Sequence, residues 1–197
     1  GRNHFAYDSG TATALADDGS TSPAFAIDST AVGGLYAGRI SLLSTEAGVA
    51  VRAPTEMAAN AGAMMLTADG RLVIGRAQAS GPVTVQSSAA PVVVETSLFS
   101  EGAITLTGIS AEVASGATLA AQSDLSITAD TVSLGAGAIA AAGMDENGDI
   151  GQSGNLTITA DTLAAADAAL AAAEDATLTA GSITLDQSTA AEAVSVQ

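Results

Sequence analysis

Apolar residues alternate with threonine in a pattern that recurs along most of the chain. Typical stretches read GAITLTG at 102–108, SDLSITA at 123–129 and GNLTITA at 154–160. A period of two places the apolar side chains on one face of a β-strand and the threonines on the other. Threonine suits such a strand because its branched Cβ fits the pleat. Each stretch therefore predicts a strand with one buried face.

The stretches recur at a nearly constant interval. They start at residues 38, 62, 81, 102, 123, 154 and 174, so the steps are 24, 19, 21, 21, 31 and 20 residues. Further short strand segments, such as 111–113 and 117–119, follow within each unit. Three short strands in about 20 residues, repeated in tandem, predict a β-solenoid whose stacked coils bury one another's inward faces. In that stack, Ile104 lies between Val83 and Leu125.

Two stretches interrupt the repeat pattern. The step of 31 residues exceeds a normal repeat by about ten, and the polar, glycine-rich segment 143–153 accounts for the excess as a loop inserted into one coil. The segment TLAAADAALAAAED at 162–175 consists of strong helix formers, so a helical repeat is the alternative interpretation. Alternating threonines on both sides of this segment favour strands, because a continuous ladder overrides local propensity.

Composition and charge narrow the function classes. The chain of 197 residues is 48% hydrophobic, has 3% aromatic residues and carries a net charge of −16. Its only basic residues besides His4 are five arginines at positions 2, 39, 52, 71 and 76, and residues 77–197 contain fourteen acids without any Lys, Arg or His. Such a chain repels phosphate, so we expect no nucleic-acid partner. The absence of cysteine excludes disulfides and thiolate metal sites.

No apolar run reaches the roughly 18 residues of a membrane-spanning helix, so we expect a protein that is not membrane-embedded. The first residue is Gly1, and we therefore expect a segment of a longer protein.

One segment resembles a known family. Residues 32–52 read VGGLYAGRISLLSTEAGVAVR, which closely resembles a motif of the filamentous haemagglutinin family, the large exoproteins of two-partner secretion. These include adhesins, haemolysins and contact-dependent growth-inhibition proteins. Segments PAFAIDST at 23–30 and AANAGAMMLTADGRL at 58–72 are also similar to that family. Leu35 and Ala50 replace the usual Met and Gly, and both are small apolar exchanges.

The resemblance implies an all-β fold, a right-handed parallel β-helix. It implies that residues 1–55 are the C-terminal part of the secretion domain and that residues 56–197 are haemagglutinin-type repeats with the inserted loop. It also implies a secreted or bacterial cell-surface protein that is exported by an outer-membrane transporter. Adhesion to a host or neighbouring-cell receptor or glycan, or presentation of a toxin, would follow from the same family, and the resemblance leaves that choice open. We expect no catalytic residues, no enzymatic activity and no cofactor.

Three groups of polar residues are candidates for chemistry. Asp145, Asn147 and Asp149 alternate as oxygen ligands do in calcium loops, although Ile150 stands where such a loop needs glycine. The aspartates of the Ala-Asp-Thr or Ala-Asp-Gly corners, at positions 69, 130 and 161, fall at one repeat position, as the acids of a β-helical polysaccharide lyase would. A turn at each corner is the simpler interpretation of these aspartates. A glycan-binding module that uses the 143–153 loop is a further alternative.

The arginines have acidic candidates as partners. We expect Arg39, Arg52, Arg71 and Arg76 to pair with acids on the coil surface, namely Glu46, Glu56 and Asp69.

Overall fold

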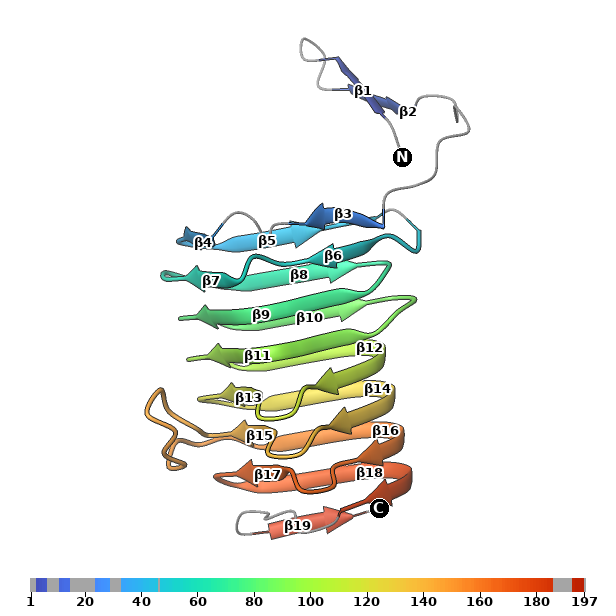
Figure 1. Cartoon of the computed structure of the whole chain (residues 1–197). Helices are drawn as coiled ribbons and strands as arrows, with labels where there is room; N and C mark the ends of the chain where they lie inside the picture. The colour runs from blue at the N-terminus through green and yellow to red at the C-terminus, as the bar shows by residue number, and fades with distance from the viewer. Residues whose placement is uncertain are drawn as a thin grey trace.

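The protein is a stack of β-strands. The computed structural model describes residues 3–6, 11–14, 24–28, 33–45, 47–185 and 193–196, and this part of the chain contains no helix. Strands β1 (Asn3–Ala6) and β2 (Thr11–Ala14) form an antiparallel pair of their own. The other seventeen strands stack in parallel as a solenoid of about 7 turns, with coils about 21 residues apart (Figure 1). The expected all-β parallel β-helix is thereby confirmed.

Three parallel ladders form three faces of the rod, and each coil adds one rung to each ladder in chain order. The first face contains β3 (Phe25–Asp28), β6 (Ala50–Arg52) and parts of β9 (Leu72–Ala79), β11 (Val92–Ser100), β12 (Ile104–Val113), β14 (Leu125–Leu134), β16 (Leu156–Ala164) and β18 (Asp175–Thr184). The second face contains β4 (Gly34–Ala37), β7 (Glu56–Ala59), the ends of β9 and β11, then β13 (Thr118–Ala121), β15 (Ile139–Ala142) and β17 (Ala169–Ala172). The third face contains β5 (Ile40–Leu43), β8 (Met64–Ala68), β10 (Val83–Ser87), the starts of β12, β14, β16 and β18, and β19 (Ala193–Val196).

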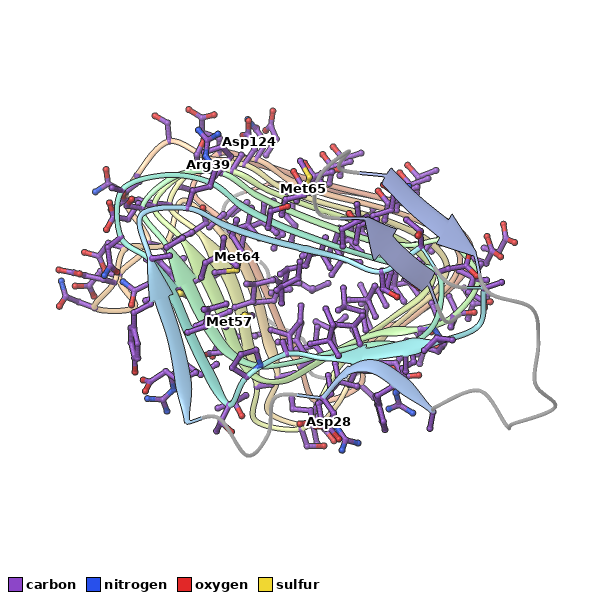
Figure 2. All side chains as sticks on the ribbon, turned by 90° about the horizontal axis from the view of Figure 1, so that it is seen from above. Asp28, Arg39, Met57, Met64, Met65 and Asp124 are labelled. Atoms are coloured by element: carbon purple, nitrogen blue, oxygen red, sulfur yellow. The ribbon has the colours of Figure 1, made fainter. Side chains whose placement is uncertain are left out.

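The core is a set of columns that run along the rod. On the third face one column consists of Ile40, Met64, Val83, Ile104, Leu125, Leu156 and Ala176, and every one of these residues is paired with the next in register. The expected position of Ile104 between Val83 and Leu125 is confirmed. Figure 2 shows Met57 and Met64 directed into this interior and Met65 directed outward. Met64 is 1% exposed and Met65 is 51% exposed, as a period of two requires.

The strand boundaries differ from the expected pattern of three separate strands in each coil. Strands β9 and β11 run from the first face into the second without a break, whereas β12, β14, β16 and β18 run from the third face into the first face of the next coil. Asp130 lies inside β14, so the expected turn at the Ala-Asp-Thr corner is wrong there. Turns occur at the other corner, between the first and second faces, at 114–117, 135–138 and 165–168.

The helix-prone segment 162–175 forms the end of β16, all of β17 and the start of β18. Leu163 stacks on Val132, and Leu170 stacks on Ala140, with both leucines buried. Backbone hydrogen bonds to neighbouring coils and burial of these two leucines outweigh the small helix preference of alanine. The preference for strands over a helical repeat is confirmed.

The loop at 143–153 leaves the coil between β15 and β16 and accommodates the longer step in the repeat (Figure 1). Leu125 and Leu156 are therefore stacked neighbours although 31 residues separate them along the chain.

Candidate functional site

The 143–153 loop folds back on itself rather than extending freely. Met144 and Ile150 form an antiparallel bridge at its base, and Asp145 N–H donates to the Asp149 carbonyl at 2.9 Å. Gly143 and Gly148 adopt φ values of 73° and 88°, which glycine accepts without steric cost. The loop is therefore a defined excursion from the coil.

The carboxylate of Asp145 organises the tip of this loop. Its Oδ1 accepts hydrogen bonds from the backbone N–H of Asn147 at 2.9 Å and of Asp149 at 3.0 Å. The hydrogen bond from Asp149, followed by those from Asn147, lowers the pKa of Asp145 below its ordinary value of 3.8. Within the described part of the chain, no three His, Cys, Asp or Glu side chains gather closely enough to hold a metal ion. The cation site at Asp145, Asn147 and Asp149 stays a prediction, and donors already engage the oxygens of Asp145.

A groove lies between the loop and the outer side of the second face. Met144 is 8% exposed and packs on Ala120 and Ala141, outside the main core. Phe99 and Ile139 pack beside this cluster but stay half-buried. The resulting groove has a volume of about 550 Å³, with Asp145 and Glu146 along its loop side.

On the far side of the same loop, a smaller hollow of about 250 Å³ is lined by acids and amides, among them Glu101 and Gln122. The groove was not among the sites expected from the sequence. The signal that could have revealed it is the apolar character of the outward positions Ala120, Ile139 and Ala141, where the third face has threonine.

The aspartates singled out as a possible acid cluster do share one column. Thr128 pairs with Thr159 and Thr131 with Thr162, so Asp130 and Asp161 lie on adjacent coils, and both are exposed. Asp69 lies in the same column but is separated from Asp130 by the coils that carry Ser88 and Ile109. The structure therefore brings together two of the three acids.

Asp69 has a structural role that sequence reasoning did not assign. Its carboxylate accepts hydrogen bonds from Ser88 Oγ at 2.7 Å and from Gly48 N–H at 2.8 Å. These bonds, led by the one from Ser88, lower the pKa of Asp69. Asp69 thus links three successive coils.

Asn155 makes a second polar link between coils. Its Nδ2 donates to Asp124 Oδ1 at 3.2 Å and to Glu174 Oε2 at 3.1 Å, and its Oδ1 accepts from Asp175 N–H at 3.2 Å. The amide therefore separates carboxylates that would otherwise repel one another along the rod. Figure 2 shows Asp124 on the outside of the rod, at the same corner as Arg39.

The arginine partners differ in part from those expected. Arg52 lies 3.9 Å from the carboxylate of Asp28, and its guanidinium carbon is 4.4 Å from the centroid of the Phe25 ring. Glu56 lies opposite Arg76 in the parallel register, and its carboxylate accepts a hydrogen bond of 2.7 Å from the Tyr36 hydroxyl, which raises the pKa of Tyr36. Glu46 lies outside the described residues. Asp28, the partner of Arg52, lies 24 residues earlier in the chain, on the neighbouring coil, and outside the repeat pattern from which the register was predicted.

The described part of the chain contains no helix long and apolar enough to span a membrane. No protein-family model and no solved structure matches the chain.

Curated proteins do match it. Toxin CdiA of Yersinia pestis is 50% identical over 58 residues, which are 29% of this chain. The tRNA nuclease CdiA-2 of Burkholderia pseudomallei is 43% identical over 74 residues, or 38% of this chain. The 16S rRNA endonuclease CdiA of Enterobacter cloacae is 39% identical over 105 residues, or 53% of this chain. The matches cover only 2 to 3% of the length of these relatives.

The comparisons correct one expectation and support another. The expected absence of enzymatic activity is wrong as a statement about this class, because two of these relatives are named as nucleases. The net charge of this stretch could not reveal an activity that the relatives carry as whole proteins. The resemblance seen at residues 32–52 is confirmed, because the homologues of this chain are CdiA contact-dependent growth inhibition proteins of the two-partner secretion, filamentous haemagglutinin-like class.

Proposed function

We propose that this chain is a rod segment of an exported surface exoprotein that presents a toxin to neighbouring bacterial cells. The CdiA homologues and the β-solenoid fit a rod of this kind. In this proposal residues 1–55 end the secretion domain and residues 56–197 begin the haemagglutinin-type repeats. An outer-membrane transporter exports the whole protein to the cell surface, and the whole protein carries a nuclease-type toxin activity like that named for its relatives.

The unbroken register of the third face is the observation that carries the proposal. Paired residues follow one another from Ile40 to Ala176, and the long loop between Leu125 and Leu156 does not interrupt them. Each coil thus presents a parallel edge on which the next coil can form. A solenoid of this type gains stability from contacts between neighbouring coils, so folding can advance from one end to the other.

Such stepwise folding suits export of an unfolded chain through a pore. The chain has no cysteine, so no disulfide can form before transit. Each coil that folds outside the pore buries its inward residues and hinders backward sliding. We infer that coil formation helps to drive export.

The test compares an inward with an outward substitution in the whole exoprotein, produced together with its own transporter. Ile104→Asn and Leu125→Asn each place an amide in the buried column, whereas Thr105→Asn changes an exposed neighbour. We expect the two inward variants to accumulate more slowly at the cell surface and in the medium, and the outward variant to be exported at the normal rate. Equal export rates for all three variants would contradict the proposed role of coil formation.

A further inference from the structure

The outer side of the second face carries a group of apolar residues in the middle of the rod. Its outward positions include Phe99 on β11, Ala120 on β13, Ile139 and Ala141 on β15, and Ala171 on β17, next to the polar outward residues Ser97 and Thr118. In the middle of the rod the corresponding positions of the third face are occupied by polar residues such as Thr105 and Ser126, whereas exposed Leu43 and Met65 lie on the earlier coils of that face. Apolar residues that gather on the outside of a protein indicate a surface to which another segment or molecule binds.

The loop covers only part of this apolar surface. Met144 buries Ala120 and Ala141, which are both 0% exposed. Phe99 and Ile139 stay half-buried and form the floor of the groove of about 550 Å³. An aromatic ring and an aliphatic side chain are thus available to a ligand.

Acidic groups line one side of that floor. Asp145 and Glu146 border the groove, and Glu101 borders the hollow on the other side of the loop. Residues 77–197 contain no Lys, Arg or His, and the same outer face carries one cation beside them, the exposed Arg76 on β9, whose register partner is Ser97. Acids therefore outnumber cations around the groove, and carboxylates beside an accessible aromatic ring are complementary to a cationic side chain with an apolar stem.

We propose that the groove between Phe99, Ile139 and the 143–153 loop binds a basic, amphipathic peptide segment of another protein. An arginine of that segment places its guanidinium over the Phe99 ring and beside Glu146, and an adjacent apolar side chain contacts Ile139. A second copy of this chain is a poor occupant, because each copy carries a net charge of −16 and the two repel each other. The inference goes beyond the proposed export role, and its test requires only the folded chain.

The test measures binding of a short fluorescein-labelled peptide of alternating arginine and leucine by fluorescence anisotropy. Peptides with serine in place of leucine, and with glutamate in place of arginine, serve as controls. We expect the arginine–leucine peptide to bind and the glutamate–leucine peptide not to bind. The arginine–serine peptide should bind at least about threefold more weakly, because it lacks the apolar contact with Ile139.

Variants of the protein assign the binding to the groove. Glu146→Gln should weaken binding roughly two- to fivefold, the value of a solvent-exposed ion pair. Phe99→Leu keeps the apolar floor but removes the ring, and should also weaken binding about two- to fivefold. Glu112→Gln is the matched control, because Glu112 lies on the first face, away from the loop. It should change the dissociation constant by less than about twofold.

Several results would overturn the proposal. Equal binding of the arginine–serine and arginine–leucine peptides, or equal effects of Glu146→Gln and Glu112→Gln, would mean that only the overall negative charge attracts the peptide. Failure of the arginine–leucine peptide to bind at physiological salt would also reject it. Self-association that the same peptide abolishes would identify a second copy as the occupant instead.

Discussion

The turns between the first and second faces permit a sharp test of backbone conformation in this fold. Gly116 and Gly137 each lie two residues before the next strand and adopt φ values of 72° and 71°. In the first of these turns Ala117 N–H donates to the Ala114 carbonyl at 2.9 Å, and in the second Ala138 N–H donates to the Gly135 carbonyl at 2.9 Å. A positive φ at the third residue of a hydrogen-bonded turn is the geometry of a type II turn, which favours glycine.

Gly116→Ala isolates the conformational part of that requirement. A Cβ added at Gly116 meets no atom within 4 Å, so no steric clash with neighbouring coils contributes. A left-handed conformation costs a non-glycine residue roughly 1–2 kcal/mol. Alanine recovers about 0.4–1 kcal/mol because it loses less conformational entropy on folding. The expected net loss is about 1 kcal/mol of unfolding free energy.

Gly151→Ala is the matched control for this substitution. A Cβ at Gly151 also meets nothing within 4 Å, but its φ does not lie in the left-handed region. Alanine there should leave stability unchanged or raise it by up to about 1 kcal/mol. Urea unfolding followed by circular dichroism measures both variants. Equal unfolding free energies for Gly116→Ala and Gly151→Ala would refute the assignment of these turns.

Asp167 extends the same test, because it is the one described non-glycine residue with positive φ, at 56°. It occupies the equivalent place two residues before β17. Asn tolerates this conformation and Ala does not, while both remove the charge. We expect Asp167→Ala to be less stable than Asp167→Asn by about 0.5–1 kcal/mol in the same assay, and equal stability would argue against the left-handed backbone.

Three further outcomes are expected. Leu125→Ala removes a fully buried side chain that lies between Ile104 and Leu156. We expect the unfolding free energy, measured by calorimetry or urea unfolding, to fall by about 2–5 kcal/mol. A fall of less than about 1 kcal/mol would mean that the column is not packed. Asn155→Asp places a third carboxylate between Asp124 and Glu174. We expect the unfolding free energy to fall by roughly 0.5–1 kcal/mol at low salt, and added salt to reduce this loss by screening the charges. A loss that does not change with salt would mean that charge repulsion is not the cause. Asp69 has a lowered pKa when folded, so its stabilising effect is present above its ordinary pKa of 3.8 and disappears as the pH falls through the lower folded value. The stability difference between wild type and Asp69→Asn should therefore shrink in acid, and a difference that grows in acid would contradict the assigned hydrogen bonds.

The repeat made the register of the rod predictable from sequence. Ile104, Leu125 and Leu156 occupy the same place in successive units, and the structure pairs them directly. A parallel ladder admits this inference because a shift of one residue would turn every apolar side chain outward. The ladder also explains why the segment around Leu170 forms a strand despite its helix propensity, because Leu170 pairs in register with Ala140 of the preceding coil.

The positions of the corners could not be predicted in the same way. Alternation of apolar and polar residues identifies which side chains point inward, but it does not say where a strand bends. Asp130 lies where the chain passes from the third face to the first, and β14 continues through it without a turn, whereas the turn at Gly137 belongs to the next corner, between the first and second faces. A glycine in the left-handed region accommodates the turn between the first and second faces, whereas the corner at Asp130 has no such residue to identify it in the sequence.

The apolar outward positions of the second face are visible in the sequence, but the groove itself depends on residues from distant parts of the chain. Phe99 and Met144 are separated by two coils, and only the folded loop places them together. The role of Asp145 was hidden for a related reason. Its spacing to Asp149 fits either a cation loop or a loop closed by its own backbone donors, and only the structure shows these donors at 2.9 and 3.0 Å.

Disulfide formation between engineered cysteines tests the stacked-coil architecture most directly, because the chain has no cysteine of its own. Ser126 and Thr157 are paired in register although the 143–153 loop lies between them in sequence. Parallel neighbours lie about 4.8 Å apart, within the roughly 4.4–6.8 Å that a disulfide spans between Cα atoms. Thr159 points outward on the same strand but lies about 8 Å from Ser126, which is too far.

The stacked register predicts that Ser126→Cys with Thr157→Cys forms a disulfide rapidly under mild oxidation of the folded protein. It also predicts that Ser126→Cys with Thr159→Cys does not. Peptide mapping of the oxidised proteins reads out both pairs. Crosslinking of the second pair as fast as the first, or failure of the first pair to crosslink, would contradict the coil register on which the rod, the groove and the proposed export role all depend.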